Sequence, residues 1–537
     1  MLLHSLNIPE IIEQIVKYLP RNDLVNFIRV SSTFHDSTIP VLYETITLPH
    51  PSRFGYPSGP GLERYKHHIK RLEFSGDYPQ EYLQLTGCHQ LQTICAPVTY
   101  GPSWYSSSNE RIFLYETLFN LSKLIERHSL TIQKLIIRPS FNSTTAPPKE
   151  FFSALKQCSQ LTSLEIGNMV VKVKTKADFY RICTRLSSLS LKNIKILELS
   201  MDSDDADKSE QEFNFSKLKT LKFINNGFYP RELSHTSQAL MIRRCPSLKY
   251  LHWESSSSMG YHTWRSDAQP QDKTTRAFCN TLAGDPWVLT RLQSLVLPGI
   301  QAEDEDIASF LKHMDYLVYL TVTDTRFGPH SFRELLTSRV FGSKGIHRPL
   351  CVSIETLNLR RCKNVTGPMV QTLLASCPNL KSFQTPKITV TDISTGDGWV
   401  CHKMNYLYTD IEADVDLESE SGIEAQKIVY SRLGSLTRLK VLALTKRECG
   451  GEPMKTIDLR LKSGLDLLAP LKDLYQISFH TDYMHRQNMG IDEANWMVEN
   501  WPSLVSFTGR PSGDSETRSK MRSIFSSKKL VVIDFLE

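Results

Sequence analysis

The chain has 537 residues, a formal net charge of +6 and a hydrophobic fraction of 40%. That fraction suffices for a continuous core, while no apolar run approaches the roughly 20 residues of a membrane-spanning helix. The mild charge, without a basic stripe interleaved with aromatic residues, argues against a nucleic-acid-binding protein. The N-terminus lacks the charged start and apolar middle of a secretory signal, so the eleven cysteines are expected to be reduced and mostly buried.

Residues 6–46 predict three short helices. The apolar stripe of the first helix consists of Ile8, Ile12, Ile15 and Leu19, and Pro9 suits its first turn. Leu24 lies in the second helix and Val30 near the end of that helix, after which a third begins. Because a helical unit of this size has more apolar surface than it can bury alone, it needs a partner.

This segment resembles an F-box. The positions that carry the resemblance are Glu10-Ile11, Ile15, Leu19, Asp23-Leu24, Val30-Ser31 and Phe34. The family's Leu-Pro pair falls on Asn7-Ile8, with the proline one place later at Pro9. The resemblance implies a Skp-type adaptor as partner, contacted by Ile8, Pro9, Ile12, Ile15, Leu19, Leu24 and Val30. The alternative is a helical cap on the rest of the chain with no partner.

A linker rich in proline, glycine and serine is predicted at 47–68, which makes 1–46 the F-box and 69–537 the remainder of the chain. Further polar stretches are expected to be exposed loops between structural units; they lie at 100–109, 140–149, 201–212, 255–273 and 410–424.

From residue 69 onward the pattern apolar-x-x-apolar-x-apolar recurs about sixteen times. The copies begin at 69, 91, 132, 161, 194, 218, 248, 292, 317, 354, 380, 404, 439, 474, 504 and 530, and their central positions are 22 to 44 residues apart. In the clearest copy, residues 354–383 predict a strand, a turn containing Cys362, a helix ending at Cys377-Pro378, and a second strand. A unit that short cannot bury its own apolar edges and must stack on its neighbours.

The repeat resembles the cysteine-containing leucine-rich repeat, which places a cysteine after the strand and a Cys-Pro pair before the next one. The resemblance implies an α/β solenoid: a curved parallel sheet with helices on the convex side, preceded by the small three-helix F-box. The irregular repeats and long inserts are similar to the large F-box and leucine-rich-repeat families of fungi.

The sequence contains no motif for catalysis. There is no P-loop, no GxGxxG after a strand, no HExxH and no GxSxG. Cys88-His89 fits the cysteine position of the repeat better than a zinc site, which needs two more ligands nearby. The expectation is therefore a non-enzymatic protein without cofactor or metal.

Together the two resemblances imply the substrate-recognition subunit of an SCF-type ubiquitin ligase, in the cytoplasm, the nucleus or both. In that family the adaptor connects the F-box to cullin and RING subunits, and the repeats hold a substrate protein for ubiquitin-dependent degradation. Candidate substrate-binding positions face solvent between strand leucines: Glu165, Glu198, Lys222, His252, Thr321, Asn358 and Ser478. A ligase-independent repeat scaffold is the alternative, and a GTPase-activating repeat protein is disfavoured by the irregular spacing.

Overall fold

The computed structural model describes most of the chain, as two compact units, Met1–Leu248 and Lys249–Glu537. The described residues are 8–48, 56–75, 78–96, 107–138, 146–196, 213–224, 235–254, 279, 282, 284, 286–300, 302–341, 346–444, 455–479, 487–528 and 530–533. Among the helices within these ranges, none has the length and apolar character needed to cross a membrane.

The first unit opens with the three predicted helices, α1 (Pro9–Val16), α2 (Arg21–Phe27) and α3 (Ser32–Glu44). Pro9 stands in the first turn of α1, and the Ser31 hydroxyl caps α3 by accepting a hydrogen bond from the Phe34 amide at 3.3 Å. Their common core is formed by apolar side chains at helical spacing: Ile12, Val16, Leu24, Ile39 and Leu42. The backbone passes from α3 directly into strand β1 (Thr45–Leu48).

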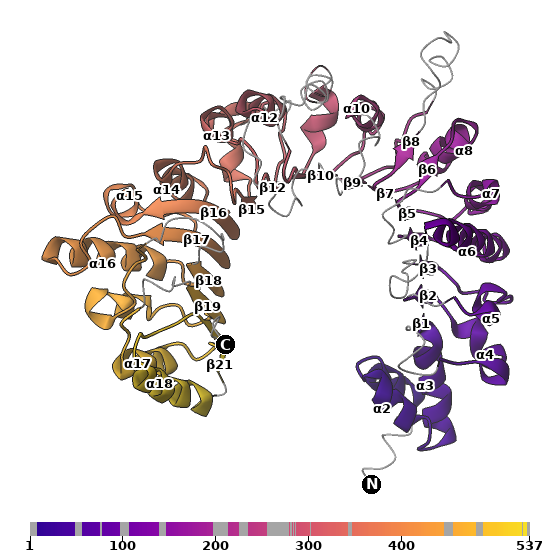
Figure 1. The fold of residues 1–537 in the computed structure, drawn as a ribbon, viewed down its shortest axis with the longest axis horizontal. Helices are drawn as coiled ribbons and strands as arrows, with labels where there is room; N and C mark the ends of the chain where they lie inside the picture. The colour runs from indigo at the N-terminus through magenta and orange to yellow at the C-terminus, as the bar shows by residue number, and fades with distance from the viewer. Residues whose placement is uncertain are drawn as a thin grey trace. The chain divides into compact units, whose positions relative to one another are not determined.

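The rest of the first unit is a parallel sheet with helices on one side (Figure 1). Its strands are β1, β2 (Arg71–Phe74), β3 (Thr93–Ala96), β4 (Lys134–Ile137), β5 (Ser163–Gly167), β7 (Ser188–Lys192) and β9 (Thr220–Ile224). Its helices are α4 (Gly59–Tyr65), α5 (Gln80–Leu83), α6 (Ser107–Arg127), α7 (Lys149–Gln157), α8 (Val173–Cys183) and α10 (His235–Arg243). The short strands β6 (Val170–Val171) and β8 (Lys195–Ile196) pair separately.

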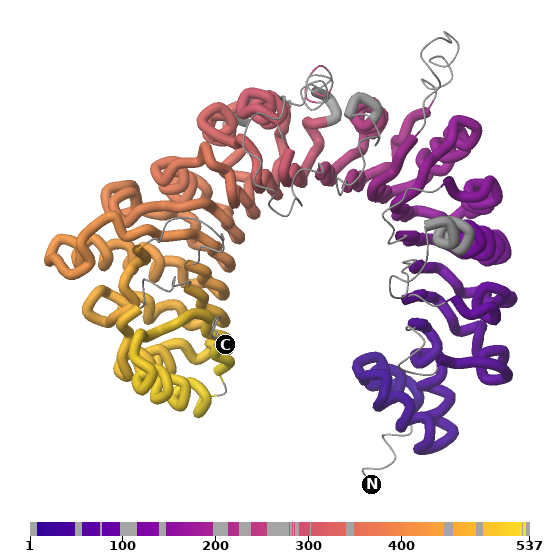
Figure 2. The backbone as a smooth tube through the Cα atoms, in the orientation of Figure 1, coloured from indigo at the N-terminus to yellow at the C-terminus, as the bar shows by residue number. Residues whose placement is uncertain are grey.

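The second unit repeats this arrangement, and in Figure 2 its successive turns of backbone stack side by side. Its parallel strands are β10 (Tyr250–Glu254), β11 (Ser294–Val296), β12 (Tyr319–Thr321), β15 (Thr356–Asn358), β16 (Ser382–Thr389), β17 (Tyr406–Glu412), β18 (Val441–Leu444), β19 (Gln476–Phe479), β20 (Ser506–Thr508) and β21 (Val531–Ile533). Its α-helices are α12 (Asp304–Leu311), α13 (Pro329–Leu336), α14 (Gly367–Ser376), α15 (Val390–Thr395), α16 (Glu420–Gly434), α17 (Ile491–Asn500) and α18 (Ser515–Ser527). Strands β13 (Arg339–Phe341) and β14 (Ile346–Arg348) pair with each other in antiparallel orientation.

The register aligns the central residue of each strand with that of its neighbour. In the first unit Leu135 pairs with Leu164, which is followed by Leu189 and Leu221. These side chains are at most 1% exposed and form one continuous row of the core. Because no single repeat could bury such a row, stacking of the repeats is what stabilises each of them. The predicted leucine-rich-repeat solenoid is thereby confirmed.

Several strands are followed by a residue in the left-handed backbone region, four positions after the central leucine. The residues are Asn168, Asn193, Gly299, Asp324 and Arg361. Glycine, asparagine and aspartate adopt this conformation most readily, which explains four of the five identities. The shared turn directs the chain from the strand toward the helical side in each of these repeats.

Two parts of the predicted repeat map differ from the structure. The main-sheet strand of this repeat is Ser188–Lys192, within the equally regular L-S-S-L-S-L of residues 186–191. Of the strand expected at 194–199, Lys195–Ile196 form the short β8, which pairs with β6, and residues 197–199 lie outside the described residues. The predicted linker at 47–68 contains the end of β1 and the whole of α4, so the repeats begin at Thr45, two residues inside the predicted F-box. Within the described ranges, the main sheets hold seven strands in the first unit and ten in the second, against the roughly sixteen predicted.

The predicted loops are only partly described. Residues 100–106, 140–145, 201–212 and 255–273 lie outside the described residues. In the predicted loop at 410–424, β17 extends to Glu412 and α16 begins at Glu420, so that only the turn between them is irregular.

Adjacent repeats cap one another's helices. At the start of α13, the Asp304 carboxylate accepts hydrogen bonds from the amides of Gly328 (2.8 Å), His330 (2.7 Å) and Ser331 (3.0 Å). Gly328 itself has no side chain with which to cap α13. Asp304 belongs to the preceding repeat helix, α12, and is 7% exposed. A buried carboxylate there is stabilised by the helix dipole and by three otherwise unpaired donors.

Arginine side chains cap the C-terminal ends of several helices. Here the capping side chain comes from the following repeat, whereas Asp304 caps a helix of the repeat after its own. Arg185 donates to the Leu155 carbonyl at 2.6 Å, at the end of α7. Arg339 donates to the Leu311 carbonyl at 2.6 Å, at the end of α12, and Arg432 donates to the Gly396 carbonyl at 2.5 Å, just after α15. In each case the arginine lies in the following repeat, so each of these contacts makes one repeat depend on the next.

Nine of the ten described cysteines are buried, and Cys95 is the half-exposed one. Burial raises the pKa of Cys88, Cys158 and Cys401 to about 12. Because the thiolate is the reactive form, such thiols are almost wholly protonated and unreactive at pH 8. These positions serve as small core residues, as the sequence predicts.

Brief iodoacetamide treatment of the folded protein at pH 8, followed by peptide mass spectrometry, should therefore modify Cys95 before Cys88, Cys158 or Cys401. Modification of these three should rise about tenfold per pH unit between pH 7 and pH 9, because the thiolate fraction does. Unfolding in guanidinium should make all of them react. Equal rates for Cys88 and Cys95 in the folded protein would contradict this expectation.

Candidate functional site

The exposed apolar surface of the three N-terminal helices is the first candidate site. On α1 and just before it, Ile8, Ile11 and Ile15 are 43%, 41% and 37% exposed. Their spacing of three and four residues places them on one edge of the helix. Tyr18, directly after α1, is 86% exposed, and Val30 is 63% exposed. An apolar stripe that extends beyond the part of the helix packed against its own domain is typical of a docking surface.

The buried edge of the same stripe belongs to the domain core. Ile12 is 1% exposed and Leu24 is 6% exposed, whereas Leu19 is partly exposed. Ile12 and Leu24 are among the residues predicted to contact an adaptor directly. Instead they pack between the helices, because α1 turns Ile12 and Val16 toward α3 and leaves Ile8 and Ile15 outside. Pro9 is exposed next to Ile8.

Three further members of this surface were not among the predicted adaptor-binding positions, namely Ile11, Tyr18 and Val25, which is 37% exposed. The spacing of Ile11 from Ile8 and Ile15 indicates that it lies on the same surface, because the three positions fall within one narrow arc of a helix. We call the exposed set Ile8, Ile11, Ile15, Tyr18, Val25 and Val30 the N-terminal apolar face.

The helices that carry this face are joined tightly to the first repeats. The Arg21 guanidinium donates to the Thr45 carbonyl at 3.1 Å. The rings of Tyr43 and Tyr65 are tilted against each other with centroids 5.0 Å apart. Tyr65 belongs to α4, in the segment predicted to be a linker. The apolar face is therefore held in a fixed orientation to the repeats that follow it.

The strand side of the repeats is the second candidate site. Of the predicted substrate-binding positions, Lys222 is exposed, and Glu165, His252 and Asn358 are partly exposed. Thr321 and Ser478 are each 8% exposed and are therefore buried. Glu198 lies outside the described residues. Glu165 is already paired with Arg138.

Lys222 belongs to the first unit, whereas His252, Thr321, Asn358 and Ser478 belong to the second.

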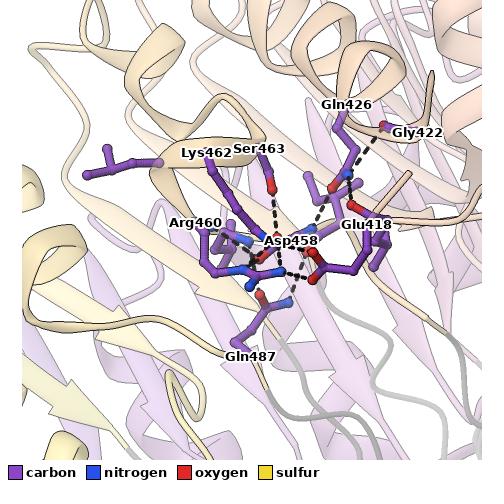
Figure 3. Close-up of polar contacts among 12 residues, drawn as sticks. Glu418, Gly422, Gln426, Asp458, Arg460, Lys462, Ser463 and Gln487 are labelled. Atoms are coloured by element: carbon purple, nitrogen blue, oxygen red, sulfur yellow. Dashed lines mark hydrogen bonds and ion pairs between the residues drawn. The ribbon is translucent and has the colours of Figure 1, made fainter. Parts of the chain in front are cut away.

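A dense polar cluster surrounds Asp458 in the second unit (Figure 3). The Asp458 carboxylate, 5% exposed, accepts hydrogen bonds from Arg460 Nε at 2.7 and 2.8 Å and from the Ser463 hydroxyl at 2.6 Å. Glu418 is paired with both Lys462 and Arg460. Hydrogen bonding to Lys462 and Arg460 lowers the pKa of Glu418 to about 2.

The surrounding contacts show what this cluster does. Gln426 on α16 accepts a hydrogen bond from the Asp458 amide at 2.9 Å, and Gln487 accepts one from the Leu459 amide at 3.0 Å. The Tyr430 hydroxyl donates to the Asp458 carbonyl at 2.6 Å. Side chains thus replace the missing strand and helix partners of this irregular segment. We therefore assign this cluster a structural role.

Within the described ranges, no group of three or more His, Cys, Asp or Glu side chains is arranged to hold a metal ion.

Comparison with known proteins places the N-terminal helices in a family. Residues 5–39 match the F-box domain. Together with the repeat geometry described above, this match makes the chain an F-box domain followed by a leucine-rich-repeat solenoid. No curated protein shows significant similarity to the chain.

Among solved structures, the chain is similar to a leucine-rich-repeat protein of Leptospira interrogans, with 14% identity over 89% of this chain and 99% of the other and a TM-score of 0.41. It is also similar to the yeast Rad7 and Elc1 complex, with 11% identity over 78% of this chain and 77% of the other and a TM-score of 0.37. An internalin of Listeria monocytogenes matches with 14% identity over 78% of this chain and 83% of the other, and a TM-score of 0.34.

Proposed function

We propose that this chain is the substrate-recognition subunit of an SCF-type ubiquitin ligase. The F-box would dock on a Skp-type adaptor, which connects it to cullin and RING subunits, and the repeats would hold a substrate protein. The observation that carries the proposal is the N-terminal apolar face, which lies on the segment matching the F-box domain. An exposed face of this kind on a small helical domain favours a protein partner.

In this role the chain makes and breaks no bonds. It raises the effective concentration of substrate lysines near the ubiquitin thioester carried by the RING-bound enzyme. The rigid junction between F-box and first repeats supports such a positioning role, because a fixed connection avoids the entropic cost of closing a flexible one. The large strand surfaces of the two units provide room for a protein substrate.

Titration of the purified full chain with a Skp-type adaptor, followed by addition of the cullin and RING subunits, tests the proposal. We expect adaptor binding with a dissociation constant in the micromolar range or tighter, and a stable assembly with cullin. Binding to the adaptor without entry into the cullin assembly would favour the ligase-independent scaffold. A folded chain that does not bind the adaptor would overturn the proposal.

A further inference from the structure

The residues on either side of the buried central position of each strand differ between the two units in charge. In strands β1 to β20 of the main sheets, the first and third residues flank a buried central residue; the first residue is exposed or partly exposed in each, whereas the third is itself more than nine-tenths buried in β4, β7, β12, β18, β19 and β20. In the first unit, charged residues occupy five of these fourteen positions: Arg71, Glu73, Lys134, Glu165 and Lys222. In the second unit, the eighteen such positions of strands β10 to β20 contain no Asp, Glu, Lys or Arg.

This absence of charge is unlike the rest of the chain. Charged residues make up 22% of the sequence, so about four would be expected among eighteen positions. Instead the positions hold seven serine or threonine residues, three aliphatic residues, three amide residues, one histidine and four tyrosines: Tyr250, Tyr319, Tyr406 and Tyr408. We call these eighteen positions the neutral band. Tyr250 is 48% exposed and Tyr319 is 40% exposed.

Charged residues return directly beyond both edges of the neutral band. Before the strands, Lys381 pairs with Glu355 at 2.7 Å. On the other side of the band, the Arg360 guanidinium lies 4.5 Å from the Tyr408 ring centroid, and Lys387, later in β16, pairs with Glu412 at the end of β17. Protein interfaces have this construction, with an aromatic centre depleted of charge and a charged rim. Tyrosine with serine is also the composition by which antibodies contact proteins.

The dimensions of the neutral band favour one shape of ligand. Nine parallel strands spaced about 4.8 Å apart span roughly 38 Å, while two rows on each strand make the band narrow. An extended polypeptide advances about 3.3 Å per residue, so about twelve residues would cross all nine strands. A charged side chain placed on the band would lose hydration without gaining an ion pair, at a cost in free energy.

We propose that the neutral band binds an extended segment of a partner protein, about twelve residues long and without charged side chains at its centre. Tyr319 and Tyr406 serve as aromatic anchors, because large side chains at the middle of an interface contribute most of the binding energy. Only the identification of that partner as the ubiquitination substrate rests on the proposed function. The binding of the segment does not depend on the proposed function.

Selection from a phage-displayed library of random twelve-residue peptides against the full chain tests the proposal. We expect the enriched peptides to contain fewer Asp, Glu, Lys and Arg residues than the unselected library. The affinity of a synthetic enriched peptide, measured by fluorescence polarisation, should fall at least tenfold in Ser382→Glu and in Ser382→Arg. Tyr319→Ala should have a similar effect.

Matched controls are provided by Ser188→Glu and Ser188→Arg, at the first position of β7 in the first unit. These should change affinity less than twofold. The proposal would be overturned if charged peptides were enriched or if no peptide were enriched. It would also be overturned if only one sign of charge at Ser382 abolished binding, or if the Ser188 variants had the same effect as the Ser382 variants. Adaptor binding is measured separately, so failure of peptide binding and failure of the ligase role are distinguishable.

Discussion

Replacing Ile11 and Ile15 together with aspartate should abolish adaptor binding while leaving the protein folded. Both side chains are about two-fifths exposed, so burying the remainder against a partner contributes on the order of 1 kcal/mol each. The larger effect is that two carboxylates would have to be desolvated in an apolar contact, at a cost of several kcal/mol. A total loss above about 3 kcal/mol weakens binding more than a hundredfold.

Titration calorimetry with the adaptor measures this effect, and circular dichroism checks the fold. A matched control is Leu130→Asp with Leu240→Asp, because these leucines are 76% and 40% exposed but lie outside the N-terminal apolar face. That variant should bind as wild type does. Leu24→Asp is a different experiment, since Leu24 is in the core and its replacement should unfold the F-box. Retention of wild-type affinity by the Ile11 and Ile15 variant would show that the adaptor binds elsewhere.

The second large effect is expected from Asp304→Ala in the second unit. The substitution removes the acceptor of three backbone amides at the start of α13 and leaves them in a buried setting. Hydrogen bonds to a charged group contribute about 1.5–3 kcal/mol each, although their losses are not additive. We expect a loss of about 3 kcal/mol in the local stability of α13 and its contact with α12.

Hydrogen exchange followed by mass spectrometry measures this loss directly. Peptides covering residues 328–336 should exchange roughly a hundredfold faster in the variant, because about 3 kcal/mol corresponds to that factor. Glu305→Ala is the control: it removes the same charge one residue away, from an exposed side chain whose ion-pair partner is His330. If residues 328–336 exchange no faster in Asp304→Ala than in the wild type, water replaces the Asp304 carboxylate as hydrogen-bond acceptor without loss of local stability.

The sequence predicted the elements that depend on local periodicity. The strand, helix and strand of residues 354–383 are present as β15, α14 and β16, with Cys362 and Cys377 buried as expected. The error at 194–199 arose because two consecutive segments satisfy the repeat pattern, one beginning at Leu186 and the other at Ile194. Only pairing with β5 and β9 distinguishes them, and pairing is not encoded within the segment.

The candidate sites were less predictable for a related reason. Ile12 and Ile15 are equivalent in a helical stripe, yet one is buried and the other exposed, because the choice depends on where α3 packs. Likewise, the neutral band becomes visible only when the register brings the first and third residues of successive strands into rows. Those residues are up to 44 positions apart in sequence and share no local pattern.

The mutual capping of helices affects how the solenoid unfolds. Asp304 supports the helix that follows it, whereas Arg185, Arg339 and Arg432 each close the helix that precedes them. Coupling therefore runs in both directions between nearest neighbours, as in a one-dimensional Ising chain. A chain cut short before Arg432 would lose more than the missing repeats, because α15 would become a frayed end. Premature truncation should thus shorten the ordered array by at least one repeat beyond the break.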